Sequence, residues 1–286
     1  MQTHSQPATL TRRKGRTFAA PFIIKQAGPF GQDGLKCWLA VPARLNRNLP
    51  PLLVVHGVLR DAKGMLKEVA SAAARTGQLV IAPLFSEQGR PGYQRVLGRS
   101  RADLSLIFLL QMLWQNGIAN THTVDLLGYS GGAQFVHRFA LLYPHLVRRL
   151  NVCSAGWYTM PDASAAYPYG LAAPAKRLSG YPAFMTDNLH HFLQLPIRVF
   201  VGEKDNQVDQ YTRSGPEIDQ QQGTHRLARA VNWVQALRTA ASERGLQTDI
   251  SMTVLENCGH DFRSCVRKGN VLDHLYAHTG SASQVA

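Results

Sequence analysis

The sequence predicts an α/β fold with a doubly wound, mostly parallel sheet. Three observations lead to this prediction. Apolar runs of strand length alternate with longer helical patterns, residues 50–56 are apolar almost throughout, and an apolar run over 123–128 leads through a glycine-rich turn straight into a helical pattern. A strand that is apolar on both faces belongs in the middle of a parallel sheet covered by helices.

Each element follows from its local pattern. Residues 21–25 and 34–43 are short apolar runs with turn residues between them, so they predict two antiparallel strands at the start of the sheet. Apolar runs predict further strands, and apolar residues at helical spacing predict helices. The expected strands are 50–56, 78–84, 123–128, 148–154, 197–202 and 250–255, and the expected helices are 63–75, 101–115, 131–143 and 224–244. This alternation requires right-handed crossovers.

The interval 156–195, after the sixth strand, interrupts the alternation. It is rich in aromatic residues and prolines and shows little periodicity. Because it is longer than a connection needs and leaves the carboxyl edge of the sheet, it predicts a lid or pocket wall, with Trp157 and Tyr158 as candidate substrate contacts. The alternative is a packed insertion that never contacts substrate. The 286 residues suit one domain over 16–280, between a flexible basic N-terminus (1–15) and a flexible tail (281–286).

The net charge of +13 is spread along the chain. No basic helix, zinc pattern or RNA-binding aromatic signature accompanies it, so we expect no specific nucleic-acid partner. No apolar run reaches the length of a membrane span. No apolar segment follows the basic residues 12–16 directly, so we expect a cytoplasmic protein rather than a secreted one. The oligomeric state is left open, with a homo-oligomer among the options.

The four cysteines lack the paired spacing of a structural zinc site, and we expect neither a metal nor a cofactor. Cys258 and Cys265 flank the region of His260 and could form a disulfide. The missing export signal favours reduced thiols instead.

The turn Gly128-Tyr129-Ser130-Gly131-Gly132 has the pattern of a nucleophile elbow. Small residues are needed two positions before and after the serine, because the strand and helix backbones approach closely there. Ser130 is therefore the candidate nucleophile, and the first amides of the following helix can stabilise an anion.

A serine hydroxyl needs a base, and the base needs an orienting group. Asp205 follows the strand 197–202 and His260 follows the strand 250–255, so the order Ser130, Asp205, His260 is the one this architecture requires. Nearby competitors for the acid are Glu203 and Asp209. The other histidines considered for the base are His56, His137, His190 and His191.

The oxyanion hole is expected to use the amide of Gly131 and that of either Val58 or Leu59, on the loop after the strand 50–56. His56 is expected to brace this loop. Beside it, Arg60 either contacts substrate or pairs with Asp61 on the surface. Tyr129, next to the nucleophile, is a further candidate substrate contact.

These residues together resemble the α/β-hydrolase superfamily, from the His56-Gly57 turn to His260. More narrowly, residues 131–139 and 155–161 resemble the branch of poly(3-hydroxybutyrate) depolymerases and feruloyl esterase-like proteins. The resemblance implies Ser130 as nucleophile, Asp205 as orienting acid and His260 as base. The sequence shows no linker or substrate-adsorbing domain like those of secreted polymer depolymerases, so we do not expect an insoluble polymer as substrate.

The sequence therefore predicts a serine hydrolase that cleaves a small to medium-sized carboxylic ester through an acyl-enzyme. An amidase, a peptidase or an acyltransferase could use the same triad. An alternative of another class is a non-catalytic binding protein on the same scaffold, attracted to anionic partners by its charge.

Overall fold

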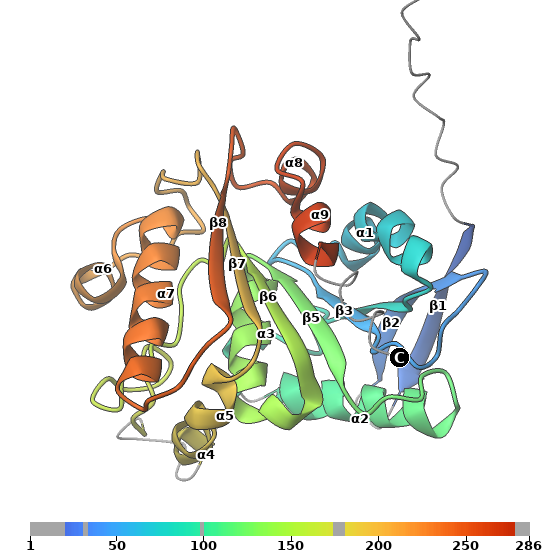
Figure 1. The fold of residues 1–286 in the computed structure, drawn as a ribbon, viewed down its shortest axis with the longest axis horizontal. Helices are drawn as coiled ribbons and strands as arrows, with labels where there is room; N and C mark the ends of the chain where they lie inside the picture. The colour runs from blue at the N-terminus through green and yellow to red at the C-terminus, as the bar shows by residue number, and fades with distance from the viewer. Residues whose placement is uncertain (1–20, 31–33, 98–99, 174–180, 278–286) are drawn as a thin grey trace, which may run out of the picture.

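The computed structural model describes residues 21–30, 34–97, 100–173 and 181–277. Within them the chain forms an eight-stranded sheet in the order β1-β2-β4-β3-β5-β6-β7-β8 (Figure 1). The strands are β1 (Phe22–Phe30), β2 (Leu35–Pro42), β3 (Leu52–Val55), β4 (Val80–Leu84), β5 (Val124–Tyr129), β6 (Val147–Cys153), β7 (Ile197–Gly202) and β8 (Ile250–Leu255). The β1–β2 and β2–β4 pairs are antiparallel and the other pairs are parallel. The predicted fold class is confirmed, including the two antiparallel strands at the start of the sheet.

Helices cover both faces of the sheet. One face carries α2 (Ala102–Gln115), α3 (Gly131–Leu142), α4 (Tyr181–Asp187), α5 (Leu189–Leu193) and α7 (Arg226–Ser242), and the other carries α1 (Ala62–Thr76), α8 (Phe262–Arg267) and α9 (Val271–Tyr276). The short helix α6 (Pro216–Gln222) lies beside α7, and η1 (Tyr93–Arg95) and η2 (Pro144–Leu146) are single 3-10 turns. In β3, Leu53 and Val55 pack with the first layer, whereas Leu52 and Val54 pack with the second. Burial on both faces explains the continuous apolar run.

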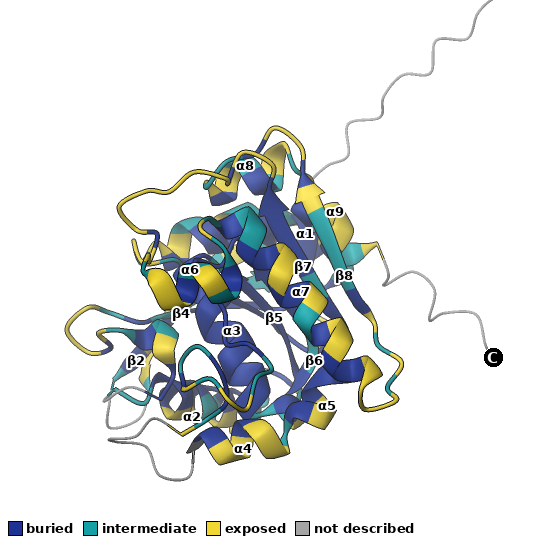
Figure 2. Ribbon diagram, turned by 90° about the vertical axis from the view of Figure 1, so that its left-hand side faces the viewer, coloured by how far each residue is buried: buried dark blue, intermediate teal, exposed yellow. Residues whose placement is uncertain are grey.

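Helix α3 is buried along its whole length, whereas the neighbouring α7 exposes its outer side (Figure 2). The chain after β6 covers the side of α3 that faces away from the sheet. There the Thr159 amide donates to His137 Nε2 at 3.0 Å, and Arg138 Nε donates to Thr159 Oγ1 at 2.8 Å. Because α3 is held from both sides, the turn that precedes it has a rigid support.

The structure does not confirm a lid over residues 156–195. The residues directly after β6 are buried against α3 and α7, and α5 ends just before β7 begins, so α5 lies at the amino edge of that strand. Residues 174–180 of this segment, and the predicted flexible ends 1–15 and 281–286, lie outside the described residues. In the described ranges, no helix has the length and apolar character that crossing a bilayer demands.

Candidate active site

Ser130 lies at a sharp turn between β5 and α3. Its φ of 53° belongs to a region that residues other than glycine rarely adopt. Glycines allow the backbones to cross at this point. A Cβ on Gly132 would lie 2.0 Å from the carbonyl oxygen of Val55, and one on Gly128 would lie 2.4 Å from the carbonyl oxygen of Gly132. The predicted need for small residues at both positions is confirmed.

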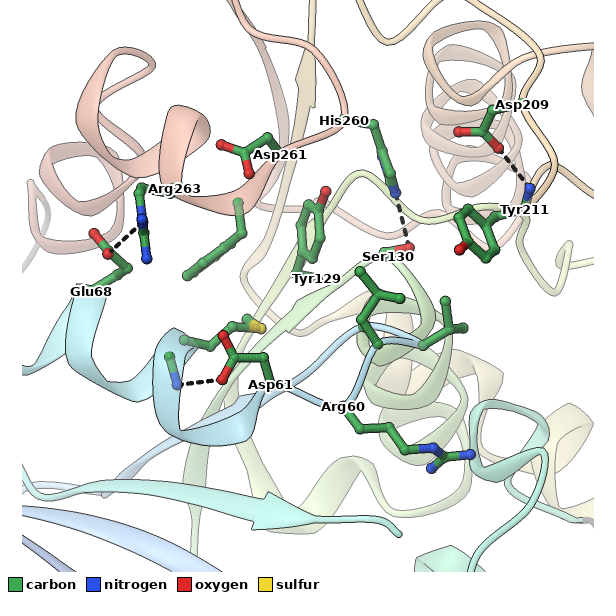
Figure 3. Close-up of a pocket in the computed structure, with 16 residues that line it drawn as sticks. Arg60, Asp61, Glu68, Tyr129, Ser130, Asp209, Tyr211, His260, Asp261 and Arg263 are labelled. Atoms are coloured by element: carbon green, nitrogen blue, oxygen red, sulfur yellow. Dashed lines mark hydrogen bonds and ion pairs between the residues drawn. The ribbon is translucent and has the colours of Figure 1, made fainter. Parts of the chain in front are cut away.

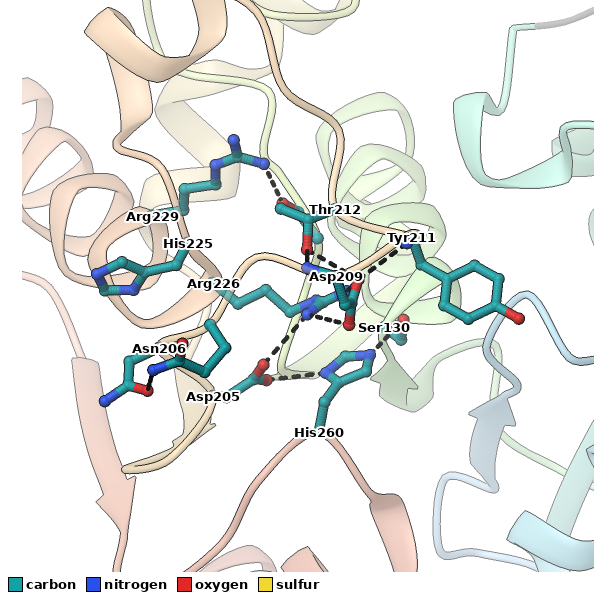
Figure 4. A network of polar contacts seen from close by, with 12 residues as sticks. Ser130, Asp205, Asn206, Asp209, Tyr211, Thr212, His225, Arg226, Arg229 and His260 are labelled. Atoms are coloured by element: carbon teal, nitrogen blue, oxygen red, sulfur yellow. Dashed lines mark hydrogen bonds and ion pairs between the residues drawn. The ribbon is translucent and has the colours of Figure 1, made fainter.

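His260 and Asp205 meet Ser130 at the carboxyl edge of the sheet (Figure 4). His260 Nε2 lies 3.0 Å from Ser130 Oγ, and His260 Nδ1 lies 2.8 Å from Asp205 Oδ2. Asp205 is buried, and the histidine side chain is 21% exposed. Because a carboxylate accepts from Nδ1–H, Nε2 is left free to accept the proton of the serine hydroxyl.

The loops that carry Asp205 and His260 are fastened to each other. The Lys204 amide donates to the Cys258 carbonyl at 2.8 Å, and this carbonyl would lie only 2.3 Å from a Cβ on Gly202. A glycine at the end of β7 therefore lets the histidine loop cross it. On its other side, the His260 ring stacks on Tyr129 at a centroid distance of 5.1 Å.

The loop after β3 lies directly beside the elbow. The Val58 nitrogen is 3.3 Å from the position a Cβ on Gly131 would occupy, so the two predicted amides are close together. Gly131 is the first residue of α3, where a backbone amide has no acceptor within the helix. Leu59, the other predicted donor, is a 78% exposed residue, and none of its atoms is among the three nearest to that Cβ position. This placement favours Val58 over Leu59.

His56 braces this loop, as expected. It lies 2.8 Å through Nδ1 from the Gly57 carbonyl, and its Nε2 accepts the amide of Phe85 at 3.1 Å. The Tyr93 hydroxyl donates to the carbonyl of His56 itself. Burial lowers the pKa of His56 to about 4, so the ring is neutral at pH 7 and donates from Nδ1.

A cavity of about 400 Å³ opens beside Ser130 (Figure 3). Its charged groups are engaged with neighbours. Asp61 and Asp261 accept amides at the starts of α1 and α8, and Arg263 donates to Glu68 at 3.0 Å. The residues that line the cavity are Gly57, Val58, Leu59, Arg60, Asp61, Gly64, Met65, Glu68, Tyr129, Ser130, Asp209, Tyr211, His260, Asp261, Phe262 and Arg263. Its walls therefore come from the loops after β3, β7 and β8, from α1 and α8, and from the elbow at the end of β5.

Two of the four predicted substrate contacts line this cavity. Tyr129 does so beside Ser130, whereas the guanidinium of Arg60 points away from the serine and donates to Glu87 (Figure 3). Trp157 and Tyr158 are not among the lining residues. Tyr158 is fully buried and stacks on Trp233 at 4.5 Å, and Trp157 lies 4.2 Å from the Arg138 guanidinium. Tyr158 therefore fills the interior between α3 and α7, whereas Trp157 is buried between the guanidinium groups of Arg138 and Arg213.

Two residues that the sequence reasoning missed belong to the site. Tyr211 lines the cavity, and Arg226 lies behind Asp205, with Nη1 3.3 Å from Asp205 Oδ1 (Figure 4). Position in the chain gave no signal for either. Asp209, considered only as an alternative acid, is the second carboxylate bound by Arg226.

Cys258 and Cys265 are both buried free thiols, as are Cys37 and Cys153. The predicted preference for reduced thiols over a Cys258–Cys265 disulfide agrees with this. Among the described residues, no cluster of three or more histidine, cysteine or carboxylate side chains is arranged to hold a metal ion.

No family model and no curated protein matches the chain. Solved structures do. The chain is similar to the poly(3-hydroxybutyrate) depolymerase LpqC from Bordetella parapertussis, with 26% identity, 85% of each chain covered and a TM-score of 0.72. It shares its fold with poly(aspartic acid) hydrolase-1 from Sphingomonas sp. KT-1, at 23% identity, a TM-score of 0.72 and coverage of 91% of this chain and 98% of that one. It also shares its fold with an S-formylglutathione hydrolase from Agrobacterium tumefaciens, at 16% identity, a TM-score of 0.59 and coverage of 91% and 96%. The chain is therefore a hydrolase of the α/β-hydrolase superfamily.

Proposed function

We propose that the protein is a serine hydrolase that cleaves a carboxylic ester of small to medium size. The observation that carries the proposal is the unbroken hydrogen-bonded relay from Ser130 Oγ through the His260 ring to Asp205, at 3.0 and 2.8 Å. Such a relay makes a serine hydroxyl nucleophilic, and here it stands on the strained turn that presents the hydroxyl to a cavity.

In the proposed reaction, Ser130 Oγ attacks the acyl carbon while His260 Nε2 takes the hydroxyl proton. Asp205 stabilises the imidazolium, and the amides of Gly131 and Val58 donate to the oxyanion. His260 then gives the proton to the departing alcohol, which leaves an acyl group on Ser130. A water molecule repeats the attack with His260 as base and frees the acid.

An ester is favoured over an amide by the likeness to a depolymerase of a polyester, the solved structure at 26% identity. The cavity of about 400 Å³ beside Ser130 is in the range that holds small to medium-sized ligands, which supports a substrate of that size. Matched ester and amide substrates with the same acyl group test the preference. We expect a higher kcat/KM for the ester, and equal or higher values for the amide would identify an amidase instead.

The nucleophile is tested by incubation with a fluorophosphonate, followed by mass mapping of the adduct. We expect one adduct, on Ser130, and none in Ser130→Ala. Ser154→Ala is a matched control, because Ser154 also follows a strand end with positive φ but is fully buried. It should label as the wild type does. An unlabelled folded wild type, or equal labelling of Ser130→Ala, would overturn the proposal.

A further inference from the structure

Arg226, the first residue of α7, is buried between two carboxylates. Its Nη1 donates to Asp205 Oδ1 at 3.3 Å and to Asp209 Oδ2 at 3.0 Å, and its Nη2 donates to Asp209 Oδ1 at 2.9 Å. The side chain is 2% exposed. A guanidinium presents several donors in a fixed plane, so a single side chain can bind both carboxylates in defined positions.

Asp205 is thereby held from two sides. One oxygen accepts from His260 and the other from Arg226, while its backbone carbonyl accepts the Leu227 amide at 3.1 Å. The start of α7 thus fixes both the side chain and the backbone of the residue that orients His260. A carboxylate with both oxygens engaged cannot rotate away from the imidazole without breaking the bond to Arg226.

Asp209 connects the same arginine to the wall of the cavity. Its carboxylate also accepts the Thr212 hydroxyl and the Tyr211 amide, both at 2.9 Å, and Asp209 and Tyr211 line the cavity (Figure 4). The hydrogen bonds from Arg226 hold the pKa of Asp209 well below its usual range. Asp209 is therefore ionised at neutral pH. The cluster behind His260, formed by Asp205, Asp209 and Arg226, thus combines two carboxylates with one guanidinium.

We propose that Arg226 is a positioning residue that orients Asp205 and offsets part of the negative charge facing His260. Asp209, in the cavity wall, reduces this offset because its own negative charge is bound to the same guanidinium. This inference rests on the proposed function. The other groups around the imidazole are the Tyr129 ring stacked on it and Asp261, which caps α8 through its bond to the Ser264 amide. Within the part of the chain that the structure describes, Arg226 donates to Asp205 and Asp209 and not to either of these two groups.

The proposal predicts opposite effects for two substitutions. Arg226→Met removes a positive charge, so the imidazolium is favoured and His260 should protonate at a pH higher by about 1 unit. Asp209→Asn removes a negative charge, so the protonation midpoint should fall, by about 0.5 unit since this carboxylate is partly exposed. Arg226→Lys keeps the charge without the planar fork, so it should restore the midpoint but not the full reaction rate.

Two measurements on the full chain decide the matter. The first is an NMR titration that gives the protonation midpoint of His260, whose signal is assigned by its loss in His260→Gln. The second is the rate of fluorophosphonate labelling of Ser130, measured as a function of pH. Arg226→Met should also lower the plateau rate about 10-fold, because Asp205 is no longer held in place. Arg229→Met is the matched control: it lies on the same helix, is equally buried and pairs with Asp219, so it should leave the midpoint in place.

Midpoints that stay within about 0.2 unit of the wild type in Arg226→Met, or that move in the same direction in both variants, overturn the inference. If Arg226→Met does not fold, Asp209→Asn and Arg226→Lys decide it by the same criteria. A folded wild type that does not label would overturn the proposed function, and with it the role of Arg226 in positioning the triad for that reaction. The NMR midpoints would still show whether Arg226 and His260 are coupled, so the two failures are distinguishable.

Discussion

At the scale of single residues, the site depends on one strained backbone position and on the small neighbours that permit it. Ser130 has a positive φ, and Gly132 and Gly128 lie where a Cβ would collide with main-chain oxygens. A collision with backbone cannot be relieved by turning a flexible side chain. The serine is therefore fixed by its neighbours rather than by its own conformational preference.

Gly132→Ala tests this dependence. The new Cβ would lie 2.0 Å from the Val55 carbonyl oxygen, so β3 and α3 must separate. We expect a loss of about 3 kcal/mol or more in the free energy of unfolding, with loss of Ser130 labelling in whatever protein remains folded. Gly259→Ala is the control, because a Cβ there meets nothing within 4 Å. It should change stability by less than about 1 kcal/mol. A Gly132→Ala protein with wild-type stability would contradict the account.

The state of His260 sets the pH dependence of the proposed reaction. Its Nε2 can accept the Ser130 proton only when the ring is neutral. We expect kcat/KM to fall as the pH is lowered from about 8 to about 5, with the protein still folded by circular dichroism. A flat profile across this range would exclude histidine as the base.

At the scale of elements, the strand that carries the nucleophile is anchored at its other end. Asp125, in β5, accepts from Arg148 Nε at 2.8 Å, Arg149 Nη2 at 2.6 Å and Gln78 Nε2 at 2.9 Å. Burial alone would raise the pKa of Asp125, but the bonds from both arginines outweigh it and hold the pKa below its ordinary value. This cluster ties β5 to the start of β6 and to Gln78, two residues before β4.

Asp125→Asn should therefore destabilise the protein at neutral pH by about 3 kcal/mol, because two arginines lose a buried partner. Because the pKa of Asp125 is lower in the folded state, its ionised form adds to the free energy of unfolding. This stabilisation is fully present above the pKa of the unfolded state and is lost as the pH falls through the pKa of the folded state. The difference in free energy of unfolding between Asp125→Asn and the wild type should thus narrow only below about pH 4. Urea unfolding from pH 7 to pH 3 measures it.

Asp249→Asn is the matched control for this experiment. Asp249 also pairs with an arginine, Arg198, but its side chain is 59% exposed. An exposed ion pair contributes about 0.5 kcal/mol or less. If Asp125→Asn and Asp249→Asn lost equal amounts of free energy of unfolding, the buried Asp125 cluster would contribute no more to stability than an exposed ion pair.

At the scale of the whole molecule, two buried histidines link segments that are distant in the sequence. His56 joins the loop after β3 to Phe85, just beyond β4. His137, in α3, lies 2.8 Å from the Ala133 carbonyl and accepts the Thr159 amide. Burial lowers the pKa of His56 to about 4 and the pKa of His137 well below its ordinary value. Both rings are neutral in the folded protein.

This makes the stability of the whole fold sensitive to mild acid. Between the unfolded pKa near 6.5 and the lower folded values, the unfolded chain binds more protons, so the free energy of unfolding should fall as the pH drops. From His56 alone we expect a loss of about 3 kcal/mol between pH 6.5 and pH 4. Thermal or urea unfolding across this range measures it.

His56→Gln should show a shallower dependence on pH, even though it is less stable at pH 7. The control is His190→Gln, because His190 is exposed and has no such link to folding. Wild-type stability that stays constant from pH 6.5 to pH 4.5 would contradict the assignment of neutral buried rings.

Much of the architecture followed from the sequence alone. The bounds predicted for β7 and β8 coincide with those observed, both ends of α1 differ by one residue, and α3 differs by one residue at its C-terminal end only. The reason is local: the period of the apolar residues reports which faces of an element are buried. The order of Ser130, Asp205 and His260, each just after a strand, also predicted that the three would meet, because parallel strands deliver their following loops to one edge.

Only the tertiary structure decided what lies around these three residues. Trp157 and Tyr158 follow a strand end, as the residues of a pocket wall would, yet both are buried: Tyr158 packs between α3 and α7, and Trp157 packs against Arg138 and Arg213. Arg226 begins a long helix, and no sequence pattern marked it as part of the site. It is buried because Asp205 and Asp209 approach it from a loop some twenty residues earlier. The sequence determined the strands, the elbow and the chain order through local periodicity, whereas long-range packing decided which side chains are buried and paired.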